Sequence, residues 1–165
     1  MARNARVKYL DFSNGAGLVP PLPATLTVGV PVNLGSVTVK GANSNDREVV
    51  TATINHVMDL GGTATAGDYQ ISFQLSRKVG SGATVPVYTT TDGGSNATGV
   101  AAIPPVDPKG TTTTFVYAET GLSGSSITYS LTATLTAAAA TGGTIAVSIV
   151  SPVFLVGTLY DENED

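Results

Sequence analysis

Two segments of this chain alternate strictly between apolar and polar residues. In residues 69–76, Tyr69, Ile71, Phe73 and Leu75 alternate with Gln and Ser. Residues 126–136 repeat the pattern, with Ile, Tyr, Leu and Ala alternating with Thr and Ser. Successive side chains of a β-strand point to opposite faces. This period of two therefore predicts two strands, each with one face on a core and the other wet or at an interface.

The remaining segments read as further short strands separated by turns. Thr and Val, which are β-branched and favour strands, recur throughout. Clusters of Gly, Asn, Asp and Pro predict turns or loops at 41–46, 60–68 and 92–110, and a loop also at 137–143. The additional strands are expected at 24–30, 32–39, 48–58, 84–90, 111–119, 144–150 and 153–160. The last two are apolar on both faces, which places them centrally or at a subunit contact.

This pattern predicts the fold class. Eight or nine strands with closely spaced turn signals and no convincing helix are typical of an all-β, antiparallel β-sandwich of jelly-roll type. The 165 residues suffice for one domain with its own core, expected over 24–160. The segment 1–23 ends in a run rich in Gly and Pro and is expected to form an extended N-terminal arm. Residues 161–165 form an acidic tail.

Opposite charges gather at the two ends of the chain. These candidate assembly residues are Arg3, Arg6 and Lys8 in the arm, and Asp161, Glu162, Glu164 and Asp165 in the tail. One interpretation is head-to-tail pairing between subunits. The other is that both ends are solvated termini that oppose aggregation.

Low charge favours an assembled protein. Charged residues make up 12% of the chain, about half of the usual share of roughly 25%. A chain that buries its outside against copies of itself needs less surface charge than a soluble monomer. The net charge of −4 and the absence of a basic stripe argue against a nucleic-acid partner.

Targeting signals are also missing from the sequence. No apolar run is long enough to span a membrane, and no signal peptide follows Met1. We therefore expect synthesis in the cytoplasm and a final position at a spore or cell surface, or in a virion.

Chemistry for catalysis is sparse, and no enzyme activity is expected. His56 is the only imidazole and shares strand parity with apolar residues, so we expect it to be packed and hydrogen-bonded rather than catalytic. Asp46 and Glu48 flank a predicted turn and are expected to be solvated. There is no cysteine, and no cofactor is expected. Asp92 and Asn96, like the acidic tail, offer oxygen ligands for Ca²⁺ without EF-hand spacing, so we predict no metal site.

The sequence leaves open whether the chain carries glycans. Asn96-Ala97-Thr98 matches the glycosylation sequon, and the Thr-rich strand faces could carry O-glycans. We favour cross-strand Thr–Thr pairs as the role of those faces, because such pairs need no enzyme.

Three pieces carry a resemblance to a known group of proteins. They are Val-Asn-Leu-Gly-Ser-Val-Thr-Val at 32–39, Glu-Val-Val-Thr-Ala-Thr-Ile at 48–54 leading to Tyr-Gln-Ile-Ser-Phe-Gln-Leu-Ser-Arg at 69–77, and Ser-Ile-Thr-Tyr-Ser-Leu-Thr-Ala-Thr-Leu at 126–135. Their layout resembles small jelly-roll proteins of firmicute spore surfaces, of the exosporium, coat and appendage type. The resemblance covers about 24–160 and implies a β-sandwich assembled into trimers, layers or fibres. The collagen-like stalk and the cysteines found in such proteins are absent here.

The sequence thus predicts a non-enzymatic structural subunit whose partners are copies of itself, joined by sheet packing and the N-terminal arm. The alternatives are a phage or viral capsid or tail accessory protein, and a glycan-binding jelly-roll module with its site at 92–110 and 41–46.

Overall fold

The computed structural model describes residues 6–13, 21–97 and 109–161. Their strands are β1 (Arg6–Ser13), β2 (Ala24–Thr25), β3 (Pro31–Ala42), β4 (Arg47–Val79), β5 (Thr84–Ala97), β6 (Lys109–Thr120) and β7 (Gly124–Asp161). Within these residues there is no helix, and hence none long and apolar enough to cross a bilayer.

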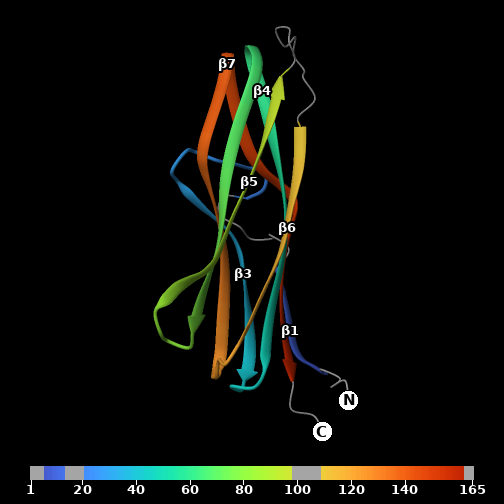
Figure 1. Ribbon diagram of the computed structural model, residues 1–165, viewed down its shortest axis with the longest axis vertical. Coiled ribbons are helices and arrows are strands. Elements are labelled where there is room, and N and C mark those ends of the chain that lie inside the picture. Colours follow the sequence, from blue (N-terminus) through green and yellow to red (C-terminus); the bar gives the residue numbers. More distant parts are fainter. Residues whose placement is uncertain (1–5, 14–20, 98–108, 162–165) are drawn as a thin grey trace.

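A single long ribbon of two strands, β4 and β7, organises the whole molecule. The two strands pair antiparallel from Arg47 with Tyr160 to Val79 with Ile127. Midway the ribbon folds back on itself, at the upper end of Figure 1. Each of its halves then becomes the centre of one sheet.

The fold-back divides the longer strands into two layers of four, and the two-residue β2 pairs with Ser148 and Ile149 of β7 in the first layer. In the first sheet the order is β1, residues 143–161 of β7, residues 47–62 of β4, and β6. In the second sheet it is β3, residues 124–141 of β7, residues 66–79 of β4, and β5. All these neighbouring strands are antiparallel, and β4 and β7 each contribute one half of their length to each layer. The predicted all-β jelly-roll sandwich is confirmed, and the described residues form seven strands rather than the eight or nine expected, because β4 and β7 each run through both layers.

Glycines make the fold-back possible. Gly62 pairs with Gly143 at the bend, and Gly62 and Gly142 have positive φ angles of 67° and 79°. A Cβ at Gly143 would lie 2.4 Å from the Gly61 carbonyl oxygen and 2.5 Å from the Ala64 nitrogen. Residues 60–68 and 137–143 were expected to be loops, but the two strands stay paired almost continuously through the bend, because glycines face each other there.

The core lies between the two sheets. Both alternating segments bury the predicted face, because the side chains of Tyr69, Ile71, Phe73 and Leu75, and of Ile127, Tyr129, Leu131, Ala133 and Leu135, are buried. They pack against apolar residues of the first sheet such as Ile54 and Leu155. The two layers also meet along one side, where the Tyr88 and Phe115 rings of β5 and β6 lie 5.0 Å apart.

Four features of the strands differ from the sequence-based expectation. β5 continues to Ala97, because residues 92–97 pair with 66–71 of β4. β2 holds only Ala24 and Thr25 of the strand expected at 24–30. Arg6–Ser13, inside the segment expected to form an arm, is an edge strand on β7. The break expected between the strands at 144–150 and 153–160 is a bulge, since Ser151 and Pro152 fall between paired residues.

Candidate interaction surface

His56 forms a buried polar network that links the two sheets. Its Nδ1 lies 2.7 Å from the Tyr69 hydroxyl and its Nε2 lies 3.0 Å from Thr113 Oγ1. Thr113 donates its proton to Asp92, so its oxygen accepts from His56 Nε2–H, and Nδ1 accepts from Tyr69. His56 and Thr113 belong to the first sheet, and Tyr69 and Asp92 to the second. The expectation that His56 is packed and hydrogen-bonded is confirmed.

The protonation of this network suits a structural role. Burial lowers the pKa of His56 against the attraction of Asp92, whose Oδ2 is 3.6 Å from Nε2. The ring is therefore neutral at neutral pH. Asp92 also accepts from the Gly93 amide at 2.7 Å, so both of its oxygens are engaged. Across the described ranges, no three His, Cys, Asp or Glu side chains are close enough to hold a metal ion.

A second buried cluster contains the acids near the start of β4. Asp46 and Glu48 are 0% and 1% exposed, so the expectation that they are solvated was wrong. Glu48 points inward because it shares strand parity with Val50 and Ala52. Asp46 is covered from β1, where Lys8 Nζ donates to its Oδ2 at 2.9 Å, and it also accepts from the Asn43 amide at 2.8 Å.

Glu119 and Arg77 complete this cluster. Arg77 Nη1 pairs with Glu119 Oε2, and the Tyr129 hydroxyl donates to Glu119 Oε1 at 2.7 Å. Burial raises the pKa of Glu48 to about 7, with repulsion from Glu119 and Asp46 adding to the rise and Arg77 opposing it. Burial also raises the pKa of Tyr117 to about 12, and that of Tyr129 too is raised by burial.

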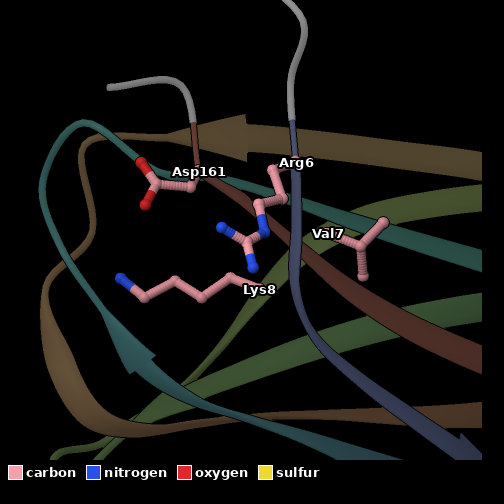
Figure 2. A pocket seen from close by; sticks show the side chains of 4 residues that line it. All are labelled: Arg6, Val7, Lys8 and Asp161. Atoms are coloured by element: carbon pink, nitrogen blue, oxygen red, sulfur yellow. The ribbon is translucent and has the colours of Figure 1, made fainter. Parts of the chain in front are cut away.

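The charged ends of the chain lie side by side within one molecule. Arg6 and Asp161 are partners in the β1–β7 register, and with Val7 and Lys8 they line a pocket of about 210 Å³. In Figure 2 the Arg6, Lys8 and Asp161 side chains extend to one side, and Val7 points the other way. Four of the candidate assembly residues, Arg3, Glu162, Glu164 and Asp165, lie outside the described residues.

The outer face of the second sheet is polar. Its central strands present Thr128, Ser130 and Thr132 of β7 beside Gln74 and Ser76 of β4. Some of these hydroxyls meet across strands, as Thr38 and Thr128 do at 2.9 Å. The predicted cross-strand Thr–Thr pairs are confirmed at this position.

The outer face of the first sheet carries a group of apolar side chains beside polar ones such as Thr51, Thr53 and Thr114, and we call this group the apolar face. It is formed by the outward side chains of four adjacent strands. These are Val7, Leu10 and Phe12 of β1, Phe154, Val156 and Tyr160 of β7, Val49 of β4, and Val116 and Ala118 of β6.

Several side chains of the apolar face project well into solvent. Leu10 is 59% exposed, Phe12 50% and Val116 60%. The rings of Phe12 and Phe154 stack with their centroids 5.8 Å apart. Arg47, at the lower edge of this face, lies with its guanidinium 5.4 Å from the centre of the Tyr160 ring.

One signal of this surface was present in the sequence. The strand expected at 153–160 was apolar on both faces, which indicated a central strand or a subunit contact. It is central to the first sheet and it also contributes Phe154 and Val156 to the apolar face. The contributions of β1 and β6 were not anticipated.

Comparisons with known proteins show a distant likeness to viral structures. A structure of infectious bursal disease virus Gx strain aligns at a TM-score of 0.39 and 12% identity, covering 96% of this chain and 37% of that chain. The VP2 subviral particle of the same virus aligns at 0.33 and 14%, covering 95% and 39%. The chain thus spans less than two fifths of these virus chains. No protein-family model and no curated protein matches the sequence. Similarities at these TM-scores carry no information about function. The resemblance to spore-surface proteins stays a prediction.

Proposed function

We propose that this chain is a non-enzymatic structural subunit that assembles with copies of itself into a layer, shell or fibre. The observation that carries the proposal is the apolar face of the first sheet. Exposed apolar patches larger than a few hundred Å² are rare on soluble monomers and mark interaction sites. Here such side chains occupy four adjacent strands.

The contrast between the two outer faces supports the proposal. The described outward positions at the centre of the second sheet carry hydroxyl and amide groups, whereas the first sheet adds exposed Leu, Phe and Val side chains to its outward threonines. An antiparallel sheet with a free outer face normally alternates apolar inside with polar outside. The second sheet follows this rule. The first sheet departs from it, which is expected when its outer face is covered by a partner.

The place of the assembly is also part of the proposal. The resemblance seen in the sequence supports a spore surface, and a phage or viral capsid or tail is the alternative. Both places would use the same kind of contact, the packing of one sheet on another.

Sedimentation velocity of the purified full chain over a range of concentrations, with electron microscopy of the same samples, tests the proposal. We expect oligomers or ordered arrays that grow with concentration. A chain that stays monomeric up to its solubility limit would contradict the proposal. Specific binding on a glycan array by such a monomer would favour the glycan-binding alternative instead.

A further inference from the structure

Resting on the proposed function, we infer that the apolar face binds the apolar face of a second copy, related by a twofold axis parallel to the strands. Each β1 then lies over β6 of the other copy, and β7 lies over β4. The inference follows from how residues are arranged in rows across the face.

Two rows decide the direction of the axis. One runs Phe12, Val156, Thr51 and Val116 from β1 to β6, and the next runs Leu10, Thr158, Val49 and Ala118. An axis parallel to the strands sets Phe12 over Val116, and Leu10 over Ala118, of the other copy. An axis across the strands would set β1 over β1 and crowd the large side chains of Phe12 and Leu10 together.

The charge on this face fits the same arrangement. Arg47 on β4 is in register with Tyr160 on β7 and lies against its ring. The parallel axis brings β4 of one copy over β7 of the other. Each guanidinium then meets a second aromatic face, a favourable contact for a cation.

The size of the face suits a contact within a larger assembly. Four strands spaced about 4.8 Å apart and rows running from Arg47 to Asn55 give roughly 500 Å² per copy. Two copies together bury about 1,000 Å², the lower bound for a specific interface. A pair held by this face alone is weak, and further contacts would strengthen it in a layer or shell.

Charge substitutions at the predicted contact test the inference. We expect Phe12→Glu and Val116→Lys each to weaken association at least tenfold in sedimentation velocity. The double variant, which sets the new carboxylate against the new ammonium of the other copy, should recover most of that loss. Thr89→Lys, an exposed position of β5 on the opposite outer face, is the matched control and should associate like the unaltered chain. Circular dichroism melting confirms that each variant is folded.

Cysteine cross-linking gives a second measurement on the full chain, which contains no cysteine. Under oxidation, Leu10→Cys combined with Ala118→Cys should yield a covalent dimer, and Leu10→Cys alone should not. A dimer from Leu10→Cys alone, or single charge variants that are not rescued by the double variant, overturns the twofold arrangement and leaves the proposed function standing. An unaltered chain that never associates overturns the proposed function itself.

Discussion

Glu48 on β4 lies directly opposite Glu119 on β6, and both side chains lie largely inside the sandwich. Arg77 pairs with Glu119, whereas both carboxyl oxygens of Glu48 are buried without a hydrogen-bond partner. Removing a carboxylate from water without a partner is costly, and the usual response is to take up a proton. A proton on Glu48 therefore balances the charge of this cluster.

Stability should consequently fall as the pH rises. The pKa of Glu48 is raised from 4.5 to about 7 by folding. Its contribution is fully present below pH 4.5 and is lost as the pH rises through 7. Each pKa unit corresponds to about 1.4 kcal/mol, so the loss is on the order of 3 kcal/mol. Glu48→Gln should remove this dependence, and urea unfolding at pH values between 4 and 9 measures it.

The difference between the variant and the unaltered chain isolates this effect from other groups. His56 acts in the opposite direction, since its lowered pKa makes the fold less stable as the pH falls through the unfolded value of 6.5. Asp59→Asn, which changes an exposed acid on the same strand, is the control. Parallel pH curves for Glu48→Gln and the unaltered chain would show that folding leaves the pKa of Glu48 unchanged.

Tyr69→Phe should weaken the link between the two sheets. The change removes the hydroxyl that lies 2.7 Å from His56 Nδ1 and leaves a buried ring nitrogen without that partner. We expect the free energy of unfolding to fall by about 1–3 kcal/mol. Chemical denaturation measures the loss, and Tyr88→Phe, which changes a ring packed against Phe115, is the comparison. Equal effects of the two substitutions would contradict a specific role for the hydrogen bond.

Lys8→Met should destabilise the fold, because Asp46 would remain buried without the cation that pairs with it. Asp46 is fully buried and Lys8 Nζ is 2.9 Å from its Oδ2. Breaking a pair that contains a buried carboxylate leaves an uncompensated charge, and we expect a loss of about 2–4 kcal/mol. Thermal unfolding measures it. Lys40→Met, at an exposed position of β3, should cost less than about 0.5 kcal/mol.

Gly143→Ala should open the bend of the β4–β7 ribbon. The new Cβ would meet backbone atoms of Gly61 and Ala64 at 2.4 and 2.5 Å, and backbone cannot give way as a side-chain end can. We expect a loss of about 2 kcal/mol or more. Gly110→Ala is the matched control, because its Cβ would meet only Val57 Cγ1 at 3.7 Å. Denaturant unfolding of both variants shows whether the crowding at the bend, rather than the loss of a glycine, is responsible.

The sequence predicted the architecture where strand alternation is regular. Residues 69–76 and 126–136 bury the expected faces because a period of two leaves a single way to place them on a core. Glu48 was misplaced because its charge was given more weight than its strand parity. β1 was missed because a register shift between Val7 and Tyr9 breaks its alternation. The bend at Gly61 and Gly62 was read as a loop, since sequence alone does not show that strands 80 residues apart stay paired through it.

The apolar face could be anticipated only in part. The segment 153–160, which is apolar on both faces, indicated one strand of this surface. The other contributions depend on which strands flank β7 and β4, and that is a matter of pairing between segments distant in sequence. Leu10 and Val116 lie on the same surface only once the strands of the first sheet have paired.

The central place of β7 in both layers has a consequence for the order of folding. β7 follows the other described strands in sequence, yet within the described residues β1, β2 and β3 pair with no strand other than β7, and β4 pairs with it over nearly its full length. A nascent chain therefore cannot close either sheet until β7 has left the ribosome. Until then the edges of β4 and the future core remain open to other chains, so aggregation during synthesis is the hazard that this topology carries.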